Sequence, residues 1–323
     1  PDKVFEQSVI YLQVYFGGSL FSVVYNMSAG ILNAVGNSRR SLVYLMIAAI
    51  SNIFLDLIMV VGLKLGIVGA ALATDISQLI SCIFIWGFLI RSEDVYKLKI
   101  KEIRCYDHLL SKIIRIGIPT GIQNIVISLS NLIVQASVNS FGATVMAGFV
   151  AYIKIDGFNI LPVLSISMAA TTFAGQNIGA GKADRVRKGM YISTAMGAGY
   201  SVITGIVLLI FAPQVIGVFT TNHKVVEYGV YIMKYFCPFY WMLGILHVLG
   251  GTIRGTGKTM QAMIVFLVSL CGFRVMWIAG TMAWAKSLGH VMMCYPTSWL
   301  LGMLLMILYV WKGKWMVLRT EKI

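Results

Sequence analysis

Long apolar runs follow one another along the chain, and short polar or glycine-rich turns separate them. Each run covers about 20 residues or more, enough for an α-helix to cross a hydrocarbon core about 30 Å thick. The short alternating strands of a membrane barrel are not evident in the sequence. The pattern predicts an all-α polytopic membrane protein with nine spans, at residues 7–35, 41–63, 66–90, 114–139, 144–174, 189–212, 226–251, 260–284 and 288–311.

The composition supports a membrane protein. Hydrophobic residues make up 58% of the chain and charged residues 12%, whereas a soluble domain carries about 25% charged residues. The five cysteines are scattered and form no Cys-x-x-Cys pair, so neither a disulfide framework nor a zinc site is expected. The sequence starts at Pro1, and its first residues do not read as a signal peptide, so we expect a fragment without its natural start.

The positive charges mark one side of the membrane. Most of the 26 Lys and Arg residues occupy alternate turns and the C-terminal tail. By the positive-inside rule, the C-terminus is cytoplasmic and Pro1 lies outside, in a multi-pass protein of the cell (plasma or inner) membrane. Topology thus explains the net charge of +14. Because no nucleic-acid-binding module is recognisable, the expected partners are the lipid bilayer and no nucleic acid.

Asp56 places a carboxylate inside the apolar run 41–63, four residues after Asn52. An acidic residue at the centre of a membrane helix costs about 2.5–3.5 kcal/mol on insertion scales, and it normally faces the bundle interior or an aqueous cavity. Residues i and i+4 share a helical face, so Asn52 and Asp56 are expected to lie together. Amide and carboxylate oxygens suit a hard cation, and a carboxylate alone can take a proton.

Two parts of the chain echo each other. Residues 32–38 (LNAVGNS) resemble residues 253–259 (IRGTGKT), and each segment ends one span and opens the next. Internal repeats in a helical membrane protein suggest a transporter with its site between the halves, although glycine-rich turns also look alike by chance. The basic segment 92–112 separates three spans from six, so two matching halves would need three further spans upstream.

Several motifs, in order along nearly the whole chain, resemble those of the multidrug and toxic compound extrusion (MATE) family. They are residues 30–38 (GILNAVGNS), 52–56 (NIFLD), 66–74 (GIVGAALAT), 117–119 (GIP), 175–181 (GQNIGAG) with Arg185, and 254–257 (RGTG).

The resemblance implies a two-lobed helical bundle of the MATE type, of which nine of twelve transmembrane helices are present. Residues 1–91 would be the second half of the N-terminal lobe (family helices 4–6), residues 92–112 a cytoplasmic inter-lobe linker, and residues 113–323 the C-terminal lobe (family helices 7–12). The implied function is secondary active antiport by alternating access, which exports amphipathic, often cationic, drugs or toxic compounds in exchange for H⁺ or Na⁺. The chain would then be a monomer and not an enzyme, and it would need no cofactor besides the coupling ion.

In the DinF-like branch of the family, the first lobe holds a cation site, and the matching positions here are Asn52, Asp56 and Thr74. Apart from Na⁺ at these residues, no metal is expected. The family's further carboxylate belongs to its first helix, which has no counterpart in this sequence. The second-lobe carboxylates of the NorM-like branch have no match either, because span 114–139 contains no acid and span 226–251 has only Glu227, at its outer end.

Two more polar residues of the first three spans are candidates for a substrate cavity. Asn26 lies in the middle of an uncharged span, where an interhelical hydrogen bond is the equal alternative. Asp75 follows Thr74 about 100° round the helix, and it either enters the same polar cavity or completes a network near the outer end.

The later spans contain three further cavity candidates. Lys154 and Asp156 are two residues apart and point to different sides of a helix, and pairing with buried polar groups that include Arg274 is the favoured alternative. His247 belongs to the residue type that most readily changes charge near neutral pH, although a lone His in a span is more often a packing residue.

Two other functions compete with antiport. A lipid-linked oligosaccharide flippase of the same superfamily usually carries extra helices or a strongly basic cavity, and the in-span cations here are only Lys154, Lys234 and Arg274. A membrane enzyme or a receptor is the more distant alternative, because neither a catalytic constellation nor a soluble sensor domain is evident.

Overall fold

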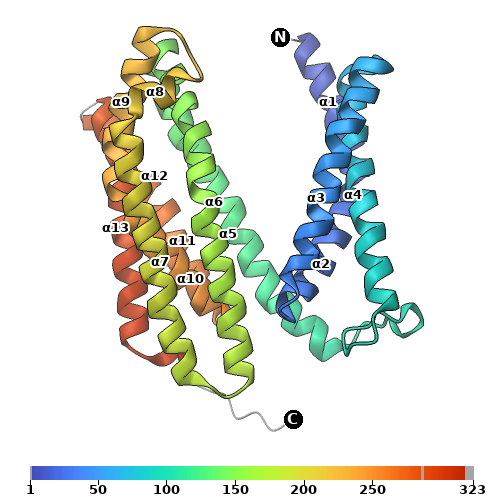
Figure 1. The fold of residues 1–323 in the computed structure, drawn as a ribbon. Coiled ribbons are helices and arrows are strands. Elements are labelled where there is room, and N and C mark those ends of the chain that lie inside the picture. Colours follow the sequence, from blue (N-terminus) through green and yellow to red (C-terminus); the bar gives the residue numbers. More distant parts are fainter. Residues whose placement is uncertain (1, 285–286, 317–323) are drawn as a thin grey trace. The chain divides into compact units, whose positions relative to one another are not determined.

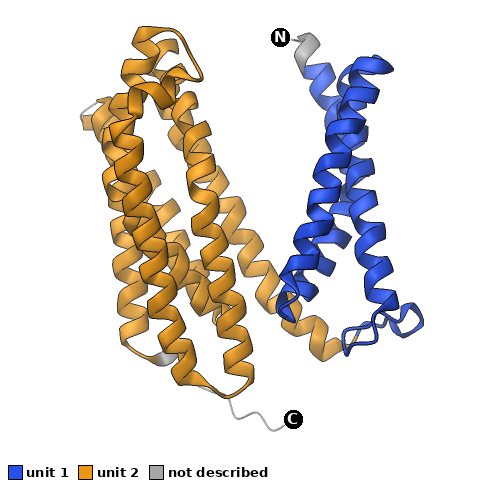
Figure 2. Ribbon diagram, viewed as in Figure 1, with its two compact units in different colours: residues 1–105 blue, residues 106–323 orange. Residues whose placement is uncertain are grey.

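The computed structural model describes residues 2–284 and 287–316, which form helices joined by turns with no β-strand among them (Figure 1). The chain divides into two compact units, Pro1–Cys105 and Tyr106–Ile323 (Figure 2).

Unit 1 contains three long helical segments, of which the first is bent and the second continues into a π-helix. Its elements are α1 (Asp2–Gly17), α2 (Ser19–Ala34), α3 (Ser38–Asp56), the π-helix η1 (Leu57–Gly62), α4 (Gly66–Arg91) and the 3₁₀ turn η2 (Ile100–Glu102).

Unit 2 contains the longest helices and several short ones. Its elements are α5 (Asp107–Asn139), α6 (Ala143–Gly179), α7 (Ala183–Ile210), α8 (Ala212–Gly217), α9 (His223–Phe236), the 3₁₀ turn η3 (Cys237–Phe239), α10 (Tyr240–Gly255), α11 (Thr259–Leu267), the π-helix η4 (Val268–Gly272), α12 (Phe273–Trp284), α13 (Leu288–Trp311) and η5 (Lys314–Met316).

Among the described residues, eight helices or helix runs are long and apolar enough to cross a membrane, and α1 with α2 makes a ninth if this pair, bent by 46°, counts as one span. The all-α polytopic prediction is therefore confirmed. Helix α5 begins at Asp107, inside the segment 92–112 that the sequence pattern assigns to a linker. Its first turns are too polar to be recognised as part of a membrane span, so the hydropathy pattern did not show where the helix starts.

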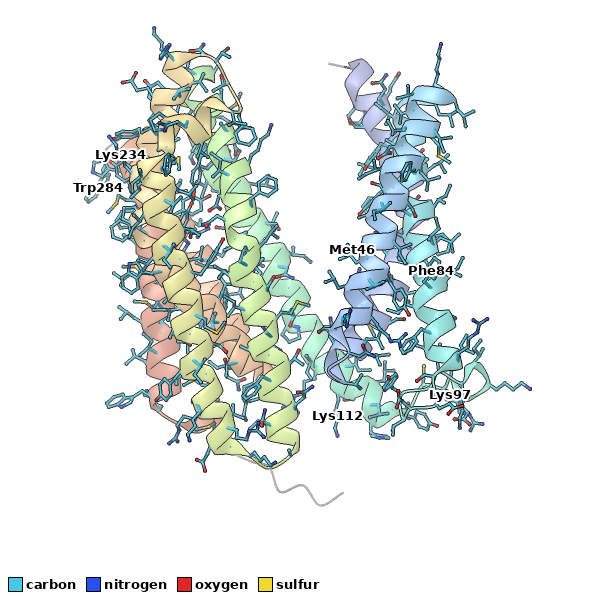
Figure 3. The ribbon with its side chains drawn as sticks, in the orientation of Figure 1. Met46, Phe84, Lys97, Lys112, Lys234 and Trp284 are labelled. Carbon is cyan, nitrogen blue, oxygen red and sulfur yellow. The ribbon has the colours of Figure 1, made fainter. Side chains whose placement is uncertain are left out.

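Large apolar side chains cover the outside of both units. Met46 on α3 is 53% exposed and Phe84 on α4 is 47% exposed (Figure 3). In unit 2, Trp284 at the end of α12 is 95% exposed. A soluble protein rarely shows apolar surface on this scale, and a lipid bilayer covers it.

The apolar core of unit 1 is small and lies at one end of its helices, near the turn between α2 and α3. The hydroxyl of Tyr25 donates to the carbonyl of Ser41 at 3.0 Å, and the indole N–H of Trp86 donates to the hydroxyl of Ser28 at 3.1 Å. These bonds tie α2 to α3 and to α4. The buried core residues are Tyr25, Ala29, Leu32, Ile85 and Leu89.

Unit 2 is built around the crossing of α6 and α10, where small residues bring two backbones together. Gly251 and Gly255 on α10 face Ser167 and Thr171 on α6 so closely that a Cβ atom on either glycine would overlap the facing backbone. The hydroxyl of Ser167 donates to the carbonyl of His247 at 2.6 Å, and the hydroxyl of Thr171 donates to the carbonyl of Gly251 at 2.9 Å. This is the small-residue packing that membrane helices use in place of a hydrophobic drive.

The two echoing turns end their helices in the same way. In residues 32–37 and 253–258, the N–H of the last residue donates to the carbonyl of the first, at 2.8 and 3.3 Å. The glycine in the fifth position has a φ of 84° in the first turn and 81° in the second, as this helix ending requires. Residues 177–182 make the same bond at 2.8 Å, so the geometry recurs in three turns and does not by itself demonstrate a repeat.

Candidate functional site

Asp56 is the last residue of α3, and the π-helix η1 follows it directly. π-helical turns are rare and often occur at functional sites. Asn52 lies one turn before Asp56, and both side chains are half-buried. Their neighbours Ile53, Phe54 and Leu57 are exposed, so Asn52 and Asp56 occupy the inward side of the helix.

Helix α3 and η1 run antiparallel to α4, and three contacts give their register. The guanidinium carbon of Arg40 lies 4.1 Å from the ring centroid of Phe88, the ring centroids of Tyr44 and Phe84 are 6.3 Å apart, and the backbone of Met59 lies against Gly69. At this register Asp56 is level with Leu72 and Asn52 with Ile76. Thr74 lies between these levels, within about 3 Å of each along the helix axis at 1.5 Å per residue.

Three polar atoms in this part of unit 1 are buried and have no hydrogen-bond partner. They are the Nδ2 of Asn52, the Oδ1 of Asp56 and the Oε1 of Gln78, which is one turn after Thr74 on α4. The hydroxyl of Thr74 donates to the carbonyl of Ala70 at 3.1 Å, and its oxygen can still accept or coordinate. An unsatisfied buried polar group costs about 1–3 kcal/mol, so a bound ligand at this level of the α3–α4 pair would stabilise the structure.

The donor set fits a small hard cation or a proton. A turn of the Asn52 amide presents its oxygen instead of its nitrogen, on the same helical side as the Asp56 carboxylate, and the Thr74 hydroxyl lies between their levels on α4. Such oxygens suit Na⁺ better than a transition metal. Within residues 2–284 and 287–316, no group of three or more His, Cys, Asp or Glu could hold a metal ion.

Asp75 faces away from this site. Its side chain is 8% exposed and packs directly against Gly18, at the bend between α1 and α2. Thr74 and Asp75 are adjacent on α4 and therefore point about 100° apart. The structure thus places Asp75 in the contact between α4 and the bent pair, while Asn52 and Asp56 lie on the inward side of α3.

Asn26 is exposed, and its amide nitrogen donates to the carbonyl of Ser22 at 2.8 Å within α2. This intrahelical bond replaces the interhelical bond that is the usual reason for an Asn in a span.

Arg274 in unit 2 is 3% exposed and is held by neutral partners. Its Nε donates to the hydroxyl of Ser298 at 2.9 Å, and its Nη1 donates to the Oδ1 of Asn131 at 3.1 Å. The guanidinium carbon lies 4.3 Å from the ring centroid of Tyr295. The hydrogen-bond acceptors of Arg274 thus come from α5 and α13, and its charge also interacts with the carboxyl group of Asp156.

Asp156 and Lys154 occupy different surroundings, as their spacing predicts. Asp156 has a buried Oδ1 without a hydrogen-bond partner, and it lies one turn after Tyr152, whose hydroxyl is 2.8 Å from that of Tyr240. Lys154 is exposed, and its ammonium lies 5.6 Å from the ring centroid of Phe219.

His247 is half-buried on α10, with its ring 5.3 Å from that of Phe266 in an edge-to-face arrangement. Its backbone carbonyl, rather than its imidazole, makes the hydrogen bond to α6. The contacts therefore describe a packing residue.

The sequence analysis did not single out several polar residues whose contacts or burial the structure shows to be unusual. Gln78 carried a usable signal, because an amide one helical turn after Thr74 in an apolar run is unusual. The Tyr152–Tyr240 pair had none, since its two hydroxyl groups come from helices 88 residues apart. Asn131 likewise gains its role only through the position of Arg274.

Comparison with known proteins gives consistent matches. A sequence model of the family described as MatE matches residues 119–278. The chain is 29% identical to the probable multidrug resistance protein YpnP of Bacillus subtilis (strain 168), over 100% of this chain and 72% of that protein. It is also 29% identical to the probable multidrug resistance protein NorM of Thermotoga maritima, over 80% of this chain and 57% of that protein.

Solved structures share the fold. A crystal structure of MATE in complex with MaL6 superimposes with a TM-score of 0.87 at 20% identity, over 96% of this chain and 70% of that chain. A transporter of the MOP superfamily from Pyrococcus furiosus gives the same TM-score and identity, and the same coverage of both chains. The aligned part of this chain thus corresponds to about 70% of each transporter's length.

Proposed function

Because this chain belongs to the MATE family, we propose that it forms part of a secondary active antiporter that exports amphipathic, often cationic, compounds in exchange for H⁺ or Na⁺. Proteins of this family are transporters and not enzymes. The relatives named as multidrug resistance proteins support a drug-like substrate.

The observation that carries the ion coupling is the buried, unpartnered Oδ1 of Asp56 beside the equally unpartnered amide of Asn52. A carboxylate in this position favours binding a cation or a proton over remaining bare, because an uncompensated charge in the membrane is costly. Thr74 lies at the same level of α4 and supplies a further oxygen. These three residues form the proposed coupling site, at the positions that the resemblance to the DinF-like branch implies.

The proposed cycle uses the cation to change the shape of the helix that carries Asp56. With the site open to the outside, Asp56 takes up H⁺ or Na⁺, its helix rearranges at the adjoining π-turn, and the substrate leaves. The lobes then rock to the inward-open form, the cation is released, and the next substrate enters. In such a cycle the cation acts only through its difference in affinity for the two states.

The proposal also covers the location of the protein, its oligomeric state and its substrate cavity. We place the protein in the cell membrane with its C-terminus in the cytoplasm, as a monomer without a nucleic-acid partner. Of the five cavity candidates, the proposal keeps Asn26 in unit 1 and Lys154 and Asp156 in unit 2 for substrate contact, whereas His247 makes packing contacts and Asp75 packs against the bend between α1 and α2.

A flippase for lipid-linked oligosaccharides gains no support from the side chains. Lys154 and Lys234 are both exposed in unit 2, and Arg274 is already bound by Asn131 and Ser298. Arg254 on α10 is half-buried, donates to the hydroxyl of Ser167 at 3.4 Å and lies 5.7 Å from the ring centroid of Phe266. These four cations are therefore exposed or already have partners.

The test replaces Asp56 by Asn in the transporter and measures dye export from proteoliposomes under an imposed Na⁺ or H⁺ gradient. The amide would keep the shape of the side chain but lose its negative charge, so gradient-driven export should fall about tenfold or more, which is about 1.4 kcal/mol of ion binding. Asp184→Asn is the matched control, because Asp184 is an exposed carboxylate in the first turn of α7. Unchanged export by the Asp56→Asn protein would refute the coupling role.

A further inference from the structure

The first span of unit 1 is a broken helix. Helices α1 and α2 meet at Gly17 and Gly18 with a bend of 46°. The N–H of Gly18 still reaches the carbonyl of Val14 at 3.2 Å, but the N–H of Phe21 turns back to the carbonyl of Gly18 at 3.0 Å, an i to i−3 bond. The carbonyl of Phe16 accepts from the hydroxyl of Ser19 at 2.7 Å, and the N–H of Phe21 bonds Gly18 in place of Gly17. The break therefore leaves the carbonyl of Gly17 without its regular helical donor.

Asp75 of α4 lies directly against the break. The carboxyl group of Asp75 occupies the place where a Cβ atom of Gly18 would be, so the contact exists only because residue 18 has no side chain. The side chain of Asp75 is 8% exposed, and among the described residues it makes no hydrogen bond or ion pair. It is one wall of a cavity of about 290 Å³, whose other walls include Val14, Gly17 and Phe21.

Capping of α2 does not account for this carboxylate. An acidic group near a helix N-terminus is usually explained by bonds to the first free N–H groups. Here the side chain of Asp75 accepts no hydrogen bond from the first turn of α2 in the described structure, and α2 begins without any side-chain cap at Gly18. The carboxylate is buried, points into a cavity, and has its acceptor capacity unused.

We propose that Asp75 and the broken backbone at Gly17 and Gly18 form a second small-cation site, for Na⁺ or H⁺, separate from the site at Asn52 and Asp56. Carboxylate and freed carbonyl oxygens are the ligands that broken membrane helices offer to Na⁺, and the carboxylate also accepts a proton. The site is separate because Asp75 faces the bent pair α1–α2, while Asp56 lies on the inward side of α3. The inference concerns binding and holds whether or not Asp56 couples export.

The test counts bound cations on the purified full chain in lipid nanodiscs. Equilibrium binding of radioactive Na⁺ at constant pH, and proton uptake by back-titration without Na⁺, are measured for the wild type and for Asp75→Asn. The variant should bind about one Na⁺ or one H⁺ fewer per chain, and the arm that changes identifies the ion. The same loss of about one ion should occur in an Asp56→Asn background, because the sites are independent.

Two glycine variants test the site without touching the carboxylate. Gly18→Ala puts a methyl group where the carboxyl of Asp75 lies and should abolish the same ion. Gly30→Ala is the matched control, because Gly30 is on the same helix α2 but away from the bend, and has no atom within 4 Å of the new methyl group; this variant should keep the ion. Helical circular dichroism and a monodisperse elution profile confirm that each variant is folded. If a folded Asp75→Asn protein binds as many Na⁺ and H⁺ ions as the wild type, the second site does not exist. If Asp75→Asn has no further effect after Asp56→Asn, there is one site and not two.

Discussion

Replacing Gly255 by Ala should loosen the crossing of α6 and α10 on which unit 2 is built. A Cβ atom on Gly255 would lie 2.8 Å from the Cβ of Ala174 and would also overlap the carbonyl of Thr171. Carbon atoms pack at about 3.5–4.0 Å, so the helices have to separate by about 0.7 Å or more. One turn away, the 2.9 Å bond from Thr171 to the carbonyl of Gly251 would lengthen beyond the normal hydrogen-bond range.

The magnitude follows from these contacts. Overpacking costs about 1–3 kcal/mol, and a weakened interhelical hydrogen bond in a membrane adds about 0.6 kcal/mol. The better helix propensity of Ala returns at most about 1 kcal/mol. We therefore expect Gly255→Ala to destabilise unit 2 by about 1–3 kcal/mol, which lowers its melting temperature by about 2–12 °C.

The assay is thermal unfolding of the purified chain in detergent, followed by circular dichroism. Gly157→Ala is the matched control, because Gly157 is also helical, on α6, and has no atom within 4 Å of a built Cβ. This control should leave the melting temperature unchanged or raise it slightly. A Gly255→Ala protein that melts at or above the temperature of the Gly157→Ala protein would show that the close helix crossing is not what holds the unit.

Two further substitutions probe single hydrogen bonds within each unit. Arg274→Lys should lower the melting temperature, because a lysine ammonium cannot reach both Ser298 and Asn131 as the planar guanidinium does. One of these buried partners would lose its hydrogen bond, which costs about 1–3 kcal/mol. A melting temperature equal to that of the wild type would contradict the assigned hydrogen bonds. Ser28→Ala keeps the indole of Trp86 but removes the hydroxyl that accepts its N–H at 3.1 Å. Chemical unfolding of unit 1 should therefore show a loss of about 1 kcal/mol, and no loss would mean that this bond does not stabilise the unit.

The positions of the helices were predictable from hydropathy alone. In a bilayer every backbone polar group needs an internal partner, so an apolar run of sufficient length has few alternatives to a helix. The ends of several helices were also predictable, because glycine readily adopts the positive φ that ends a helix. Gly36, Gly181 and Gly257 all have this conformation.

The bends and π-helical turns within the helices were harder to predict from the sequence. The span 7–35 is apolar throughout, and only the adjacent Gly17 and Gly18 hinted at its bend. Nothing in the composition of residues 57–62 distinguishes a π-helix from an α-helix, because a single extra residue per turn leaves the hydropathy unchanged.

The partners of the polar residues depended on tertiary structure. The spacing of Asn52 and Asp56 correctly placed them on one helical side, since i and i+4 pairs follow from helix geometry. By contrast, the contact of Asp75 with Gly18 and the bonds of Arg274 to Asn131 join residues 57 and 143 positions apart. Such pairings arise from the way whole helices pack, which one sequence does not encode locally.

The unequal cores of the two units have a consequence for cooperativity. Unit 1 rests on a cluster of five buried apolar residues at one end of its helices, whereas the cluster of unit 2 reaches through most of its helices. Each set of contacts stabilises only the helices that share it, so we expect the two units to unfold in separate transitions. In that case each measured free energy of unfolding would describe a single unit, and we expect amide exchange to start in the half of unit 1 that carries Asp56.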